Sequence, residues 1–134
     1  MKQNDLIPEL AVHDLDVSLR FYLDVIGFEM VYSRPEEGFA FLQLSDSQLM
    51  LDQIDLGRTW RTASFDHPLG RGVNFQIRVD GVQTVTDRLA AAGLEPYMAT
   101  ETKWYRVGDE QQGQRQVLIQ DPDGYLLRLF ETLG

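Results

Sequence analysis

The spacing of apolar residues changes period along the chain, and each change predicts a new element. Residues 6–12, LIPELAV, alternate between apolar and polar positions, which is typical of a strand. The apolar residues that follow repeat at helical spacing: Leu15, Leu19, Tyr22 and Ile26. Asp14 or Asp16 can cap the start of this helix, and Gly27 can end it.

The remaining segments predict strands, one further helix and one long loop. Strands are expected at 28–34, 38–44 and 47–53, and later at 73–79, 94–100, 115–120 and 125–131. The second helix is expected within 80–93, where Val82, Val85 and Leu89 form one stripe. Residues 54–72 show no period and predict a loop, and long loops in compact domains are often functional.

The order strand, helix and three strands occurs twice, which indicates an internal duplication. Asp14 corresponds to Asp80, and Gly27-Phe28 corresponds to Gly93-Leu94 at the same offset. We therefore expect an α+β fold in which two βαβββ modules form curved mixed sheets around a cavity, with helices on the outer face. The expected single domain, 1–134, divides into a first module at about 5–53, a loop at 54–72 and a second module at about 73–132.

Arg128 raises a question, because it lies in an apolar strand directly after the turn sequence DPDG. A cation there is costly unless it faces a cavity or a partner. Strand alternation places Arg128 on the second, mixed side of its strand, and the same side of other strands carries Glu9 and Asp52. One interpretation is a cavity wall in which Arg128 pairs with one of these carboxylates. The other is an ordinary solvated sheet face with surface ion pairs.

Composition narrows the classes of partner. The chain has 134 residues, 21 acidic against 12 basic side chains, a net charge of −9 and no cysteine. Disulfides, thiolate metal sites and a cysteine nucleophile are excluded, and the composition fits a cytoplasmic protein. The negative charge disfavours nucleic acid and attracts cationic ligands. No stretch approaches the roughly 18 apolar residues of a membrane span, so no membrane partner is expected.

Together, the repeat, HDLDVSLRFYLDVIGF and DPDGYLLRLFE resemble the vicinal-oxygen-chelate superfamily of glyoxalases, extradiol dioxygenases and bleomycin-resistance proteins. The match covers essentially the whole chain. Within it, GQRQVLIQDPDGYLLR is most similar to the bleomycin-resistance branch. Members of that branch carry a Trp before their Gly-Arg-Glu-Phe run, and Gln112 stands at this position here, so the resemblance implies an altered pocket.

Enzymes of this superfamily bind one divalent metal with His, Glu or Gln side chains from four strands. Carried onto this chain, the four ligand positions are Ile7, Met50, Asn74 and Arg128. Isoleucine cannot ligate, methionine is soft, neutral asparagine is a poor ligand and a guanidinium repels a dication. The resemblance therefore implies that neither a metal nor another cofactor is present. Glu9, Gln48 and Asp52 leave open a rearranged metal site.

Aromatic residues predict a ligand site. Phe39 and Phe41 alternate on a strand, Trp60 lies in the long loop, and Trp104 and Tyr105 lie in ETKWYR, which we place outside regular structure. Such rings can stack on a planar ligand, or can form a dimer interface instead. The expected ligand-binding residues are Phe39, Phe41, Met50, Asp52, Trp60, Asn74, Gln76, Trp104, Tyr105 and Arg128.

Two functional hypotheses follow from the residues and the resemblance. The first is a metal-free protein of the bleomycin-resistance type that sequesters a planar, cationic antibiotic and has no catalytic residues. The second is a metal-dependent lyase, isomerase or dioxygenase with a rearranged ligand set. His13 and His67 are expected to be structural or exposed. A homodimer is expected because open sheet edges gain from pairing with a second copy.

Overall fold

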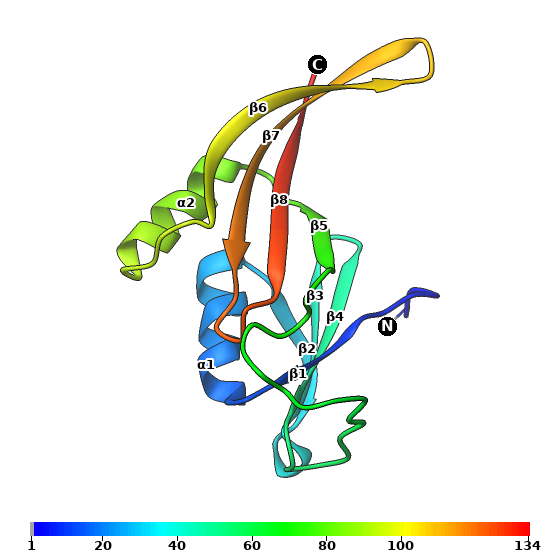
Figure 1. Cartoon of the computed structure of the whole chain (residues 1–134), viewed down its shortest axis with the longest axis vertical. Coiled ribbons are helices and arrows are strands. Elements are labelled where there is room, and N and C mark those ends of the chain that lie inside the picture. The colour runs from blue at the N-terminus through cyan, green and yellow to red at the C-terminus, as the bar shows by residue number, and fades with distance from the viewer. Residues whose placement is uncertain (1) are drawn as a thin grey trace. The chain divides into compact units, whose positions relative to one another are not determined.

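A computed structural model describes residues 2–134 and divides the chain into two compact units, one ending at Leu69 and the other beginning at Gly70. Each unit holds one four-stranded mixed sheet and one helical segment (Figure 1), which confirms the α+β class and the two βαβββ modules. None of the helices in the described part of the chain is long and apolar enough to cross a lipid bilayer.

In unit 1 the strand order is β1-β4-β3-β2. Its elements are β1 (Glu9–Val12), α1 (Leu15–Leu19), the π-helical turn η1 (Arg20–Ile26), β2 (Glu29–Arg34), the 3-10 turn η2 (Pro35–Glu37), β3 (Phe39–Leu44) and β4 (Ser47–Gln53). Strands β1 and β4 are parallel, and the other two pairings are antiparallel. The four residues of the predicted helical stripe lie in α1 and η1, where all but the half-buried Leu19 are buried.

The predicted ends of the first helix are confirmed. Asp14 is the N-cap, and its Oδ1 accepts from the backbone N–H groups of Asp16 and Val17 at 3.0 and 3.3 Å. At the other end, Gly27 has a φ of 107°, a left-handed conformation that costs glycine little. Gly27 and Phe28 both donate to the carbonyl of Tyr22. Local chemistry therefore sets both boundaries.

In unit 2 the order β5-β8-β7-β6 repeats that of unit 1. The elements are β5 (Asn74–Arg78), α2 (Val82–Ala91), β6 (Met98–Val107), β7 (Glu110–Gln120) and β8 (Leu126–Leu133). Helix α2 packs against β7 and β8 through the predicted stripe, in which Val82, Val85 and Leu89 are all buried. The N-cap residues of the two helices are Asp14 and Gly81. Asp14 therefore corresponds to Gly81, one residue after the predicted match, Asp80.

The DPDG turn between β7 and β8 has the hydrogen bonds that its sequence predicts. Oδ1 of Asp121 accepts from the backbone N–H groups of Asp123 and Tyr125, both at 2.9 Å, and Gly124 has a φ of 98°. Both aspartates are buried. Strand β8 begins after this turn, at Leu126. Leu127 and Leu129 are buried, and Arg128 lies between them on the opposite side of the strand.

The prediction that ETKWYR, with Trp104 and Tyr105, lies outside regular structure was wrong, because β6 continues through it to Val107. Residues 101–112 form the regular outer part of a hairpin, with Glu101 paired to Gln116 and Val107 to Glu110. The tip extends past the end of β8, whose last pairing joins Leu133 to Gly113, and Figure 1 shows it projecting there. Its side chains are mostly exposed, so hydrogen bonds between the strands stabilise it rather than burial. Such strands lack the apolar alternation that reveals other strands.

Candidate functional site

One face of the unit 1 sheet carries charged and aromatic side chains, while the opposite face is apolar and packs toward the helix. Leu10, Leu42 and Leu51 are buried on the helical side. Because side chains alternate along strands, their neighbours lie on the open side. In the strand order of the sheet, register aligns two rows there: Glu9, Met50, Phe41 and Tyr32, and then Ala11, Asp52, Phe39 and Arg34. We call these eight residues the acidic face.

Aromatic rings form a packed layer on the acidic face. The Tyr32 ring stacks on Phe41, with centroids 5.3 Å apart and planes inclined by 15°, and lies 5.8 Å from Phe39. Phe39 and Phe41 are buried in spite of their position on this face, and Tyr32 lies against both rings. The Arg34 guanidinium lies 4.1 Å from the Phe39 centroid and forms an ion pair with Glu37. The layer therefore already holds one planar cation, supplied by the chain itself.

Two carboxylates lie on the same face, and neither is fully solvated. Burial raises the pKa of Glu9, and the charge of Asp52 raises it further, whereas Arg34 lowers it. The pKa of Asp52 is raised by burial and by the Glu37 carboxylate, with Arg34 again opposing. Like charges in partial burial destabilise each other's ionised form. A cationic ligand placed beside them would relieve that repulsion.

Trp60 lies in the long segment between β4 and β5, which contains no helix or strand from Ile54 to Val73, as predicted, and Trp60 belongs to unit 1. Trp60 is 64% exposed, and the Arg58 guanidinium lies 4.8 Å from the centroid of its ring. Phe65 has a similar contact with Arg61, at 4.7 Å. Trp60 is thus accessible for stacking, although its place in a ligand site stays a prediction.

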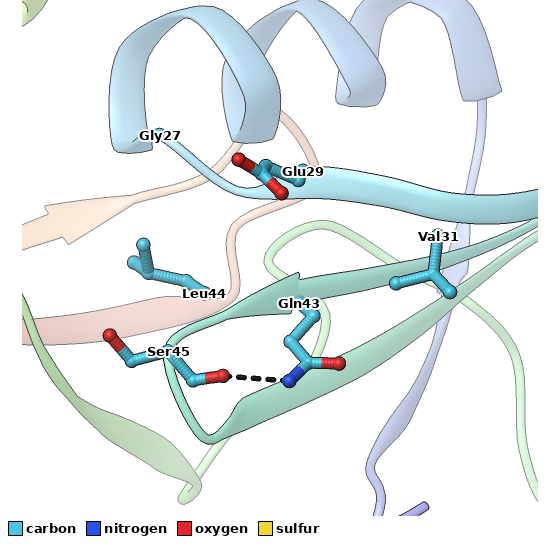
Figure 2. A pocket seen from close by; sticks show the side chains of 6 residues that line it. All are labelled: Gly27, Glu29, Val31, Gln43, Leu44 and Ser45. Carbon is cyan, nitrogen blue, oxygen red and sulfur yellow. Dashed lines mark hydrogen bonds between the residues drawn. The ribbon is translucent and has the colours of Figure 1, made fainter. Parts of the chain in front are cut away.

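A small pocket lies at another part of unit 1. It has a volume of about 240 Å³ and is lined by Gly27, Glu29, Val31, Gln43, Leu44 and Ser45 (Figure 2). In Figure 2 the amide of Gln43 donates to the Ser45 carbonyl, at 2.8 Å. None of the predicted ligand-binding residues lines it, and its volume is below the roughly 300–1,000 Å³ of ordinary ligand pockets. The pocket is therefore not our candidate site.

The open face of unit 2 is built by the same topology but carries different side chains. Register aligns Asn74 with Leu126 and Gln120, then Gln76 with Arg128, Leu118 and Met98, and then Arg78 with Phe130, Gln116 and Glu101. The Arg78 guanidinium lies 5.2 Å from the Phe130 ring centroid. We use the name basic face for Asn74, Gln76, Arg78, Gln116, Arg128 and Phe130.

A buried amide holds the predicted residue Arg128. Nη2 of Arg128 donates to Oε1 of Gln116 at 3.3 Å, and Gln116 is only 4% exposed. Nε2 of Gln116 donates to a Glu101 carboxylate oxygen at 2.9 Å and to the Tyr105 hydroxyl at 3.2 Å. These two bonds orient the amide so that its oxygen faces Arg128. Within unit 2, Arg128 is therefore linked to a carboxylate through Gln116.

Trp104 and Tyr105 lie on opposite faces of the β6–β7 hairpin, as neighbouring residues of a strand must. Tyr105 lies on the side of Gln116 and the basic face. The Trp104 ring instead covers its cross-strand partner Gly113, where an added Cβ would be 2.7 Å from ring atoms. Trp104 is 53% exposed, so its role in stacking or in an interface stays a prediction.

The four family ligand positions do not fit a divalent metal. Ile7 is aliphatic, Met50 offers a thioether, Asn74 a neutral amide and Arg128 a cation. Gln48, considered for a rearranged site, is buried and binds backbone groups: its Nε2 donates to the Lys2 carbonyl, and its Oε1 accepts from the Asn4 N–H. Across residues 2–134 no group of three His, Cys, Asp or Glu side chains is arranged to hold a metal. The two histidines, His13 and His67, are exposed.

Sequence reasoning missed Tyr32 and Arg34 as members of the site. Strand β2 contains an irregularity between Met30 and Tyr32, where one extra residue shifts the register against β3. Simple alternation along MVYSR therefore assigns the wrong residues to the open face. A signal was present in the neighbouring aromatic pair Phe39 and Phe41, which need a covering partner on β2.

Comparison with known sequences gives one family. A sequence model described as "Glyoxalase/Bleomycin resistance protein/Dioxygenase superfamily" matches residues 6–129. A bleomycin resistance protein from Geobacillus stearothermophilus is 30% identical, with 95% of this chain and 96% of that protein covered. A lactoylglutathione lyase from Haemophilus influenzae is 28% identical, with 92% and 88% covered.

Comparison with solved structures agrees on the fold. TioX from Micromonospora sp. ML1 superposes with a TM-score of 0.73 at 23% identity, over 98% of this chain and all of that one. The fosfomycin resistance protein FosX from Listeria monocytogenes gives 0.61 at 21% identity, over 99% and 94%. At these identities the similarity concerns the fold and carries no statement about the ligand.

Proposed function

This chain belongs to the glyoxalase/bleomycin resistance protein/dioxygenase superfamily, and from that premise we propose that it is a metal-free binding protein. Its ligand would be a planar, cationic small molecule of the antibiotic class, held by sequestration with no bond chemistry. The similarity to bleomycin resistance proteins over nearly the whole chain supports this class. The cytoplasm is the proposed location, since a protein without cysteine needs no oxidising compartment.

One observation carries the proposal: the acidic face combines a stacked aromatic layer with two carboxylates whose pKa values are raised. A flat cation can stack on the rings and at the same time separate Glu9 from Asp52 electrostatically. The Arg34 guanidinium on Phe39 is an internal example of the same chemistry. Displacing Arg34 is a cost that the ligand must offset, so a larger aromatic cation is expected to bind better than a small one.

The test is a calorimetric titration of the purified chain with metal-free bleomycin, and with a planar anion such as naphthalene sulfonate. Saturable binding of the cation alone is expected, and it should weaken with salt because charge attraction is screened. A double variant, Glu9→Gln with Asp52→Asn, should bind about tenfold more weakly, since each lost charge contact is worth up to about 1 kcal/mol.

A matched control removes the same charge elsewhere. Asp24→Asn with Glu95→Gln neutralises two exposed carboxylates outside the acidic face, and its affinity should stay within about twofold of the original. Equal losses in both double variants would mean that net charge, and not this face, attracts the ligand. Preference for the sulfonate would contradict the proposed cationic class.

A metal-dependent lyase is the second candidate, favoured by the 28% identity to a lactoylglutathione lyase. Metal analysis and thermal unfolding in EDTA separate the two functions. We expect no stoichiometric transition metal and an unchanged melting temperature, because the side chains at the four ligand positions do not fit a dication. About one bound equivalent, or a marked loss of stability in chelator, would favour the enzyme.

We also propose that the chain forms a homodimer. In each sheet the outer strands, β1 and β2 or β5 and β6, have one edge without a strand partner among the described residues, and such edges gain from pairing. Trp60 and Trp104 are exposed and of the residue types enriched at interfaces. Light scattering at micromolar concentration should give twice the chain mass of 15.4 kDa. A value equal to one chain would contradict the dimer.

A further inference from the structure

Arg128 has a neighbourhood on the basic face that contains amides, leucine and another arginine but no carboxylate. The register places Gln76 and Leu118 beside it on the adjoining strands. One step along each strand, the diagonal positions are Asn74, Arg78, Gln116 and Gln120. Glu101, one strand further away, is separated from Arg128 by Gln116. In a chain with 21 acidic residues, this is a local region of opposite charge.

The guanidinium of Arg128 is held in place but is not saturated. It has five N–H donors, and its bond to Gln116 uses one of them. Gln116 is buried and is itself fixed by Glu101 and Tyr105, so its oxygen stays directed at Arg128. Arg128 is half-buried. A positioned, partly desolvated guanidinium with free donors is the side chain best suited to bind a carboxylate or phosphoryl group.

Arg78 adds a second positive charge on the same face. It lies one row away from Arg128 on the neighbouring strand, exposed, with its guanidinium against the Phe130 ring. None of the ion pairs described for the chain includes Arg78 or Arg128. The two cations repel each other, and an anion between them would remove that repulsion.

We propose that the basic face is a binding site for an oxyanion, a carboxylate or a phosphoryl group on a small molecule. Arg128 is the principal binding residue and donates its free N–H groups to the anion. Arg78 supplies the second positive charge, and the side-chain amides of Asn74 and Gln76 supply further N–H donors. The site does not depend on the proposed cation binding, because it uses none of the acidic-face residues. Arg128 stands at a position that the resemblance assigns to a metal ligand. Its positive charge attracts anions, as a bound metal cation would.

The test is an NMR titration of the full ¹⁵N-labelled chain with sodium acetate and, separately, with methylphosphonate, at constant ionic strength. Saturable shifts are expected for the Arg128 Nε–H and the Gln76 side-chain amide. Arg128→Gln should weaken binding about tenfold or more and Arg78→Gln about threefold, since charge-assisted bonds are lost. Glu101→Gln removes the negative charge that lies beside Gln116 and should strengthen binding about twofold. The two titrants distinguish a carboxylate site from a phosphoryl site.

Two further variants make the result decisive. Arg88→Gln removes the same charge from an exposed position on α2 and should leave the affinity unchanged. Arg128→Lys keeps the charge without the planar fork and should bind at an intermediate level, which also guards against a folding defect in Arg128→Gln. Shifts that grow linearly without saturation, or an equal loss in Arg88→Gln, would overturn the site. Failure here leaves the bleomycin titration unaffected, since that experiment uses variants of Glu9 and Asp52.

Discussion

The open faces of the two sheets differ in the sign of their charge although the same topology builds both. At equivalent positions along one row, unit 1 has Ala11, Asp52, Phe39 and Arg34, and unit 2 has Arg78, Phe130, Gln116 and Glu101. In the adjoining row, Glu9 and Met50 correspond to Gln76 and Arg128. Two carboxylates in one unit thus stand against two guanidinium groups in the other.

The edge strand of each sheet carries one residue of the opposite charge: Arg34 on β2, within the acidic face, and Glu101 on β6, beside the basic face. Both edge residues interact with the neighbouring strand, Arg34 with the Phe39 ring and Glu101 with the Gln116 amide. Strand order and register are therefore common to the units, while the chemistry of each face is set by a few outward positions. A duplicated fold constrains where ligands bind more than which ligands bind.

The aromatic layer is the largest expected difference in stability between the faces. Phe41 is fully buried, and the equivalent residue in unit 2, Leu118, is half-buried. Phe41→Ala should cost about 3–5 kcal/mol of unfolding free energy, because it leaves a cavity under Tyr32. Leu118→Ala should cost less, about 1–2 kcal/mol. Urea unfolding of both variants checks this, and equal losses would mean that Tyr32 and Phe39 close over the cavity.

The features of the two units that could be predicted from the sequence are mostly those set by local chemistry or by buried apolar side chains. The helical stripes, the Asp14 cap and the DPDG turn follow from local chemistry, and the structure confirms them. Arg128 was recognisable because a cation among leucines is unusual. The hairpin tip was missed because its strands bury little, and Tyr32 was missed because the bulge in β2 shifts its side chain to the open face.

Loss of the hydrogen bonds of Gln116 should give the next largest effect on stability. It tests whether unit 2 depends on this buried polar side chain. Gln116→Leu removes the partner of Arg128, Glu101 and Tyr105 at once. We expect the unfolding free energy to fall by about 1–2 kcal/mol. The loss is limited because the side chains that bound Gln116 can form hydrogen bonds with water instead. Gln112→Leu, an exposed change on the same side of β7, should stay within about 0.5 kcal/mol and serves as the control. No difference between these two variants would contradict the structural role of Gln116.

The carboxylates of the acidic face predict a pH dependence of known sign. Burial and a neighbouring carboxylate raise the pKa of Glu9 and of Asp52 in the folded chain. The folded state then holds these protons more tightly than the unfolded state, so their contribution to unfolding free energy falls as pH rises from about 4 through the raised values. In Glu9→Gln with Asp52→Asn, this part of the fall should disappear.

The measurement is urea unfolding of both proteins between pH 4 and pH 7. At pH 7 the double variant should be more stable, by no more than about 1 kcal/mol because both groups are partly exposed. The gain should shrink toward pH 4, where the original carboxyls become protonated. A variant that is less stable at pH 7, or a gain that grows with acid, would contradict the cause assigned to these pKa shifts.

The smallest expected effect concerns the hairpin tip of unit 2, which extends beyond β8 and has the Trp104 ring against Gly113. Gly113→Ala would place a Cβ 2.7 Å from ring atoms, so the half-exposed ring must move while the backbone can stay. We expect a shift in Trp104 emission with a stability change within about 0.5 kcal/mol. Trp60→Phe serves as the background, because it leaves Trp104 as the one emitting tryptophan and keeps a ring beside Arg58. Emission that is unchanged by Gly113→Ala would mean that the ring does not rest on Gly113 in solution, and Trp104 would then be available for stacking on a ligand.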